Sequence, residues 1–312
     1  DVVNERTRVA VETAAHVRDI IAHLNYIPRP DKRRRVRRRD LREHYQQTIS
    51  GARQIAVLAP ETRTEAVHTP IMDDVAAGAA GYLAEYEHEL ITATLNAKGE
   101  LPLCVKRRQV DGVIIGQPGL PACLATELQH IPCVTLYEMA EAQAGDLIAP
   151  DHDAMGALAA DYLHAAGFNS MVCLNTDGLD AACHRSSNAF EFRARQLGVY
   201  CRIITLDPDQ SAGPAIASLA GQGRVSGLYL TGYTDANPLE DLEDMLDVYD
   251  FLDEPHQVIA GGVASRRFAS VGVSPERIGL HAAEQIIWRM AHRAAEPRDI
   301  RIKPVVTEPN DF

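Results

Sequence analysis

Short apolar runs alternate along most of this chain with segments whose apolar residues recur at helical spacing. Runs such as VDGVIIG and IPCVTLY are almost continuously apolar, which is typical of strands buried on both faces of a parallel sheet. The expected strands span residues 53–60, 110–116, 131–137, 170–175, 201–206 and 225–232. The expected helices span residues 70–87, 120–129, 154–167, 186–198 and 212–223. This order predicts an α/β protein with two doubly wound parallel-sheet lobes and a cleft between them.

The first 53 residues follow a different pattern. Apolar residues at helical spacing within residues 13–24 predict one short amphipathic helix that ends before Pro28. Residues 29–42 then contain nine basic and two acidic side chains. Residues 1–53 carry 13 basic and 7 acidic side chains, although the whole chain has a formal net charge of −12. This segregation indicates a polyanion-facing arm on an acidic body; the alternative is a solvated or disordered basic tail.

Composition narrows the class of protein. The longest apolar runs fall far short of the roughly 18 residues that a membrane span needs, and no signal segment opens the chain, so we expect no membrane partner and a cytoplasmic location. Six cysteines without a C-x-x-C pair predict reduced, mostly buried thiols. Because residue 1 is an aspartate, we expect that the chain begins inside a longer gene product or has lost its start.

Motifs for catalysis or metal binding are weak. The sequence has no G-x-G-x-x-G after a strand, no G-x-S-x-G and no P-loop, so it predicts neither an enzyme nor a cofactor. Asp151 and Asp153 of the DHD triplet are poor candidates for a shared metal ion, because neighbouring residues of one strand or helix point apart. The acidic segment 235–255 is interpreted as a solvated helix face. We therefore expect no metal site.

The order of the motifs resembles the lac repressor and galactose repressor family of transcriptional regulators. Residues 2–4 (VVN) resemble the end of a recognition helix, VAVETAAHVRDIIAHL the third helix of a helix-turn-helix headpiece, and NYIP the exit into the hinge. The pattern D-x-x-x-x-G-A-x-x-A-x-x-Y-L-x-x-x-G at residues 151–167 and the helix-like SPERIGLHAAEQIIWRM follow that family's periplasmic-binding-protein-like core. The resemblance implies a headpiece remnant at 1–28, a basic hinge at 29–53, an N-terminal lobe at 54–165 plus 275–303, and a C-terminal lobe at 166–274 plus 304–312.

The same resemblance implies a homodimer that binds a double-stranded DNA operator. The first two headpiece helices are absent, and the hinge is about a dozen residues longer than short linkers usually are. A hinge side chain is expected to enter the minor groove, for which Leu41 and Ile49 are both candidates. Tyr26 falls on a DNA-contacting position, with a buried role as the alternative. The residues expected at DNA are Asn4, Arg8, Thr13, Tyr26, Arg29, Arg33, Arg34, Arg35, Arg37, Arg38, Arg39 and Leu41.

The effector cleft departs from the family pattern. Sugar-binding members carry their polar clamp at the positions occupied here by Ser186, Gly232, Tyr233 and Val263. An ordinary sugar effector is therefore not expected, although Arg185 and Asp235 are nearby substitutes. The residues expected around a small-molecule effector are His68, Thr69, Tyr137, Asp153, Arg185, Tyr233 and Asp235; the alternative is that they are ordinary surface polar residues.

Together these features predict a repressor-like, DNA-binding transcriptional regulator whose two-lobe core senses an effector. The alternative is a small-molecule sensor of the same fold that does not bind DNA.

Overall fold

The computed structural model describes most of the chain from residue 53 onward. The described residues are 53–60, 69–95, 100–116, 127–137, 145–178, 180–207, 209–221, 227–232, 238–251, 256–262, 265 and 267–309. Residues 51–312 form a unit separate from residues 1–50. The expected headpiece remnant and all of the expected basic hinge except Arg53 therefore lie outside the described residues.

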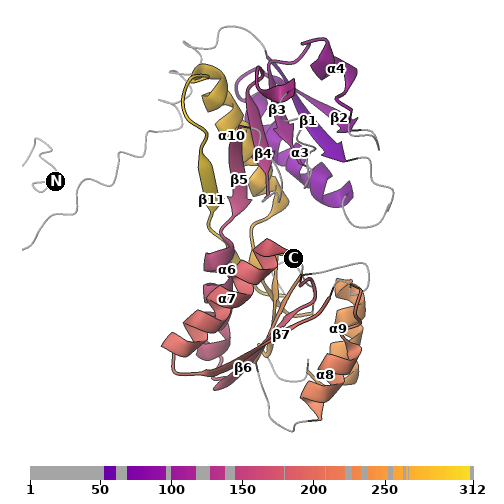
Figure 1. Ribbon diagram of the computed structural model, residues 1–312, viewed down its shortest axis with the longest axis vertical. Helices are drawn as coiled ribbons and strands as arrows, with labels where there is room; N and C mark the ends of the chain where they lie inside the picture. Colours follow the sequence, from indigo (N-terminus) through magenta and orange to yellow (C-terminus); the bar gives the residue numbers. More distant parts are fainter. Residues whose placement is uncertain are drawn as a thin grey trace, which may run out of the picture. The chain divides into compact units, whose positions relative to one another are not determined.

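The first lobe is built on a six-stranded parallel sheet (Figure 1). Its strand order is β11-β5-β4-β3-β1-β2. The strands are β1 (Gln54–Pro60), β2 (Glu89–Leu95), β3 (Gly112–Ile115), β4 (Cys133–Leu136), β5 (Asp146–Pro150) and β11 (Asp299–Ile302). The strands β3, β4 and β5 are buried along their whole length, which the apolar sequence GVII predicts for β3. Apolar side chains on one face of the sheet form a core with the short helix α4 (Leu103–Lys106).

Two long helices, α3 (Thr69–Ala84) and α10 (Pro275–Ala291), pack against each other in this lobe. Ser274 caps α10 by accepting a hydrogen bond from the backbone N–H of Arg277, and Pro275 suits the first helical turn. Glycines allow the two helices to approach closely. A Cβ added at Gly78 would lie 2.1 Å from the Glu276 carbonyl oxygen, and one at Gly279 would lie 1.9 Å from that of Val75.

The second lobe has a six-stranded sheet in the order β12-β10-β9-β8-β6-β7. Its strands are β6 (Ser170–Asn175), β7 (Tyr200–Thr205), β8 (Gly227–Thr231), β9 (Val258–Gly261), β10 (Ala269–Gly272) and β12 (Val305–Thr307). The pairings are parallel apart from the antiparallel pair of β10 and β12. Its helices are α6 (His152–Ala165), α7 (Ala181–Gln196), α8 (Gly213–Ala220) and α9 (Leu239–Val248).

Alternating side chains of β6 show how helices cover both faces of the second sheet (Figure 1). Met171 and Cys173 enter the core formed with α6 and α7, whereas Val172 and Leu174 enter the core formed with α8 and α9. The prediction of two doubly wound α/β lobes is therefore confirmed. Within the acidic segment at 235–255, residues Leu239–Val248 form α9, whose apolar residues Leu242 and Leu246 are buried.

The helix α6 corrects one expected domain boundary. The sequence placed residues 152–165 in the first lobe, with the boundary after residue 165. In the structure Ala159 and Leu163 pack in the core of the second lobe, and α6 crosses α7 closely enough that a Cβ at Gly156 would lie 2.0 Å from the Ser186 carbonyl oxygen. The chain thus leaves the first sheet at the end of β5 and joins the second lobe with the N-cap of α6, Asp151.

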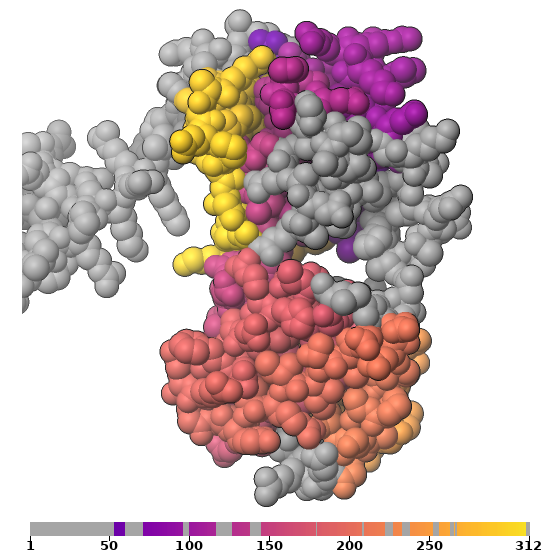
Figure 2. Space-filling view, in the orientation of Figure 1, coloured from indigo at the N-terminus to yellow at the C-terminus, as the bar shows by residue number. Residues whose placement is uncertain are grey.

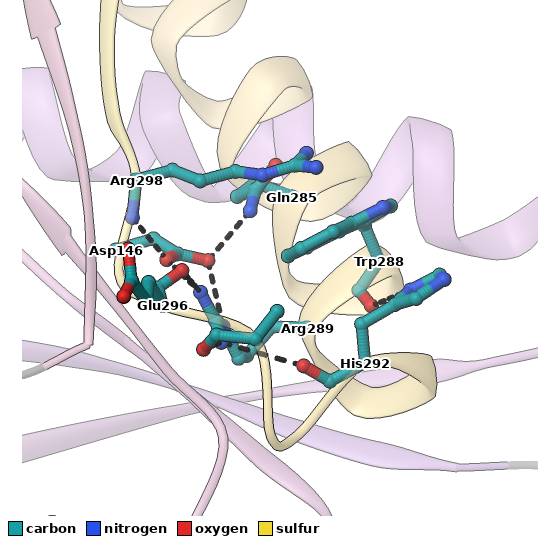
Figure 3. Close-up of polar contacts among 8 residues, drawn as sticks. Asp146, Gln285, Trp288, Arg289, His292, Glu296 and Arg298 are labelled. Carbon is teal, nitrogen blue, oxygen red and sulfur yellow. Dashed lines mark hydrogen bonds and ion pairs between the residues drawn. The ribbon is translucent and has the colours of Figure 1, made fainter.

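A buried ion pair connects three elements of the first lobe (Figure 3). Asp146, at the start of β5, is fully buried and pairs with Arg289 of α10. Its carboxylate also accepts hydrogen bonds from Gln285 Nε2 at 2.5 Å and from the backbone N–H of Arg298, just before β11, at 2.8 Å. Arg289 donates further to the carbonyl oxygens of Ala295 and Glu296. A buried charge is tolerated only when it is paired and hydrogen-bonded, as it is here.

Candidate functional site

The carboxyl edge of the second sheet is an expected position for a ligand site, because open α/β sheets bind ligands where parallel strands end. β6 ends at Asn175 and β8 ends at Thr231. The two strands are neighbours in the sheet, with Asn175 opposite Thr231. The chain then turns from β6 into α7, whose N-terminus lies at the same edge.

Acidic side chains surround the start of α7. The N-cap Asp180 accepts a hydrogen bond from the backbone N–H of Ala182 at 2.9 Å, and its other carboxylate oxygen lies 3.1 Å from Cys183 Sγ. Burial, followed by the negative charges of Asp180 and Asp177, raises the pKa of the Cys183 thiol. This thiol therefore stays protonated and is a poor nucleophile.

Two residues expected at the effector, Arg185 and Asp153, are brought together by the structure. Arg185 on α7 donates to the Asp153 carboxylate in the first turn of α6 at 2.6 Å. Figure 2 shows the outer surface of α7 in red tones on the viewed side of the second lobe. The two side chains thus form an exposed ion pair that links the N-terminal turns of α6 and α7.

Ser186 occupies the position where sugar-binding relatives were expected to carry an arginine, and it points into the protein. It is 1% exposed, and its hydroxyl lies 2.6 Å from the hydroxyl of Tyr229. Tyr229 stacks on Phe190 with ring centroids 5.0 Å apart, and burial raises the pKa of its phenol. Ser186 thus serves the packing of α7 on β8, so this position contributes no group to a ligand.

Asn175 and Thr176 were not among the residues predicted for the site. Both are buried, and neither Asn175 Nδ2 nor Thr176 Oγ1 has a hydrogen-bond partner among the described residues. Native proteins rarely leave such groups unpaired in their interior. The sequence held one signal for them, since two polar residues follow the apolar run MVCL of β6 directly.

Tyr137, which is expected at the effector, follows β4 at the carboxyl edge of the first-lobe sheet. Tyr137 has a positive φ of 63°, and burial raises the pKa of its phenol to about 12. Thr69 is the first residue of α3, but its side chain is not described. His68, Tyr233, Asp235 and Val263 lie outside the described residues, so their predicted places in the site stay predictions.

The predicted DNA contacts stay untested as well, since every one of them lies within residues 1–50 and so outside the described residues. Among the parts of the chain that the structure describes, no three His, Cys, Asp or Glu side chains are placed to hold a metal ion. Within the same parts, Cys104, Cys133, Cys173, Cys183 and Cys201 are free thiols. No described helix is long and apolar enough to cross a membrane.

Comparisons with known proteins give a fold and no closer relationship. No family model matches the chain, and no curated protein matches it. Many solved structures do share its architecture. A LacI family transcriptional regulator from Enterococcus faecium with bound ribose aligns over 82% of this chain and 97% of its own, with a TM-score of 0.61 and 17% identity.

Two further solved structures resemble the chain. A periplasmic ribose ABC transporter protein from Conexibacter woesei covers 83% of this chain and 92% of its own, with a TM-score of 0.64 and 14% identity. The transcriptional regulator CelR in complex with cellobiose covers 98% of this chain and 92% of its own, with a TM-score of 0.57 and 17% identity. The chain has the two-lobe, periplasmic-binding-protein-like fold. These structural relatives are regulators and binding proteins, not enzymes.

Proposed function

We propose that this protein is a repressor-like transcriptional regulator of the lac repressor type, which works as a homodimer in the cytoplasm. The observation that carries the proposal is the two-lobe fold it shares with LacI-family regulators, directly preceded in this chain by a strongly basic segment. The alignment with CelR over 98% of the chain supports it further. In this role the core senses a small molecule, and the N-terminal segment binds double-stranded operator DNA.

Charge supports a separate DNA-binding segment. The chain as a whole is acidic, so its body repels phosphates, whereas residues 29–42 carry nine basic side chains. Arginine suits phosphate because it stays charged and can bind two oxygens at once. Such contacts to the DNA backbone give affinity without base preference, which the headpiece would have to supply.

Sensing requires that an effector bind two states of the core with different affinities, since an effector that binds both equally shifts nothing. Closure of the two lobes around a ligand is the motion proposed here, with the carboxyl edges of both sheets facing that ligand. The second candidate function is a sensor without DNA binding. It is favoured by the likeness to the periplasmic ribose protein and by the net charge of −12.

The test compares DNA binding by the 312-residue chain with that of a variant in which Arg33, Arg34, Arg35, Arg37, Arg38 and Arg39 are replaced by glutamine. Affinity for a duplex is measured by fluorescence anisotropy over a range of salt concentrations. Each lost phosphate contact should flatten the slope of log affinity against log salt by about 0.9. The weakening should be similar for all sequences.

The matched control replaces Arg107, Arg108 and Arg293, three exposed arginines of the core, by glutamine. It removes half as many charges but should leave the slope unchanged. An equal slope in the parent and the six-arginine variant would reject the arm as a DNA-binding element. A chain extended at its N-terminus by the first two helices of a helix-turn-helix headpiece should gain sequence preference, and if it binds no DNA, the sensor without DNA binding is the better description.

A further inference from the structure

Asn175 and Thr176, at the carboxyl edge of the second sheet, each have a side-chain hydrogen-bonding group without a partner among the described residues. Asn175 Oδ1 accepts from the backbone N–H of Asp177 at 3.0 Å, and the Thr176 N–H donates to the Thr231 carbonyl at 2.9 Å. The side chains are 0% and 1% exposed, yet Asn175 Nδ2 and Thr176 Oγ1 have no partner among the described residues. The backbone here is therefore fixed while two side-chain groups stay unused.

The local structure keeps the Asn175 amide in place. Gly232, directly after β8, has a φ of +77°, and a Cβ at this position would lie 2.7 Å from Asn175 Oδ1. The glycine thus leaves the space that the amide fills. On the other side, the chain runs from Thr176 into the 16-residue helix α7, which is capped by Asp180 and directs the positive end of its dipole toward this edge.

We propose that Asn175 and Thr176 form the floor of a ligand site at the start of α7, where Asn175 Nδ2 and Thr176 Oγ1 donate hydrogen bonds to an oxygen acceptor of the ligand. A buried donor without a partner destabilises the folded state, so it persists where a ligand uses it. This inference rests on the proposed sensing function and assigns residues to it.

The negative charges near Asn175 and Thr176 favour an uncharged ligand over an anion. Asp177 and Asp180 flank the start of α7, and Asp153 lies in the first turn of α6, where Arg185 balances it. A phosphate or carboxylate would be repelled by the first two aspartates. A neutral compound with hydroxyl or amide groups fits better, since it offers an acceptor oxygen to the floor and N–H or O–H donors to the aspartates.

The first measurement tests whether the unpaired Thr176 hydroxyl destabilises the folded state in the absence of ligand. Replacing Thr176 by valine removes an unpaired hydroxyl at constant shape, so the midpoint of urea unfolding should rise, by about 0.3 M. Thr231→Val is the matched control, because the Thr231 hydroxyl bonds to Cys183 and Tyr229. That variant should unfold at lower urea. A Thr176→Val protein that loses stability as Thr231→Val does would show that Thr176 is already satisfied, which overturns the proposal.

The second measurement screens the unmodified 312-residue chain by thermal shift against neutral polyols, sugars, amides and nucleosides, each paired with its phosphate ester. Neutral compounds should stabilise the protein and their esters should not. For each compound that stabilises it, Thr176→Val and Asn175→Leu should weaken binding by about tenfold or more, as loss of a buried hydrogen bond to a ligand does. A panel without any neutral binder, or binders that are all phosphate esters, refutes the assignment.

These results separate this inference from the proposed function. A neutral compound that binds the parent and Thr176→Val equally refutes only the role of these two residues. A compound that needs Thr176 but leaves the affinity for DNA unchanged confirms the site and counts against regulation of DNA binding.

Discussion

Replacing Asp146 by asparagine should be among the most damaging single changes in the first lobe. The substitution keeps the size of the side chain and removes its charge, which leaves the buried guanidinium of Arg289 without its partner. Asp146 is 0% exposed and Arg289 is 6% exposed, so water cannot take over the lost interaction. Breaking a buried pair in this way costs about 3–5 kcal/mol of the free energy of unfolding.

The structure provides both the reporter and the control for this experiment. Trp288 is the sole tryptophan of the chain and neighbours the cluster, with the Arg298 guanidinium 3.2 Å from its ring centroid and His292 stacked at 4.5 Å (Figure 3). Its fluorescence therefore reports urea unfolding of the first lobe. Glu100→Gln is the control, because it breaks an exposed pair of the same lobe, with Lys106 of α4, and should cost about 0–1 kcal/mol.

Two outcomes would refute this reasoning. One is a cost for Asp146→Asn no larger than that for Glu100→Gln. The other concerns the double variant Asp146→Asn with Arg289→Met, which removes both charges. It should recover part of the lost stability, since an apolar side chain can replace a buried pair at little cost. A double variant less stable than either single variant would mean that the hydrogen bonds of Arg289 to the backbone carbonyls matter more than the ion pair.

Two further predictions concern the first lobe. Burial lowers the pKa of His88 below its ordinary 6.5, so the unfolded chain binds the proton more readily than the folded protein does. The contribution of His88 to stability should be fully present above about pH 6.5 and decline as the pH falls below it. His88→Gln should therefore flatten the dependence of the urea midpoint on pH between about 7 and 5, and an unchanged slope would contradict this. Gly78→Ala should destabilise the protein by about 1–3 kcal/mol in thermal unfolding, because the added Cβ would collide with Glu276. Gly81→Ala is the control on the same helix: its Cβ would have no atom within 4 Å, so it should be neutral or stabilise the protein by up to about 1 kcal/mol. Equal effects of the two substitutions would contradict the close packing of α3 and α10.

The parts of the fold that the sequence predicts are those whose burial is visible locally. The strands β3, β6 and β8 are mostly apolar, and their positions were predicted from that alone. The strand β2 (ELITATL) was missed because it lies at the edge of its sheet and is only partly buried. The strand β5 was missed for another reason. It begins with Asp146, a charge that is buried only because Arg289, 143 residues later, pairs with it.

The candidate site likewise has features that the sequence indicates and features that depend on tertiary contacts. Arg185 and Asp153 could be named from their positions in a family pattern, but that they bind each other depends on the close crossing of α6 and α7 at Gly156. The family pattern drew attention to Ser186, whose hydroxyl turns inward to Tyr229. Asn175 and Thr176 correspond to no motif, and they differ from ordinary buried polar residues only because Asn175 Nδ2 and Thr176 Oγ1 have no hydrogen-bond partner among the described residues.

The Asp146 cluster also bears on how a signal could pass through the core. The chain crosses between the two sheets three times, after β5, before α10 and after β11. Asp146 begins β5, Arg289 lies near the end of α10 and Arg298 precedes β11, so one buried network holds these three elements together at the ends that lie away from the crossings. At the crossings themselves, the Asp151 N–H donates to the Ile302 carbonyl at 2.9 Å. Lobe closure in the proposed regulator would then bend the chain near Asp151, residues 273–274 and residues 303–304, because hinge motions are absorbed by a few residues at the ends of rigid elements.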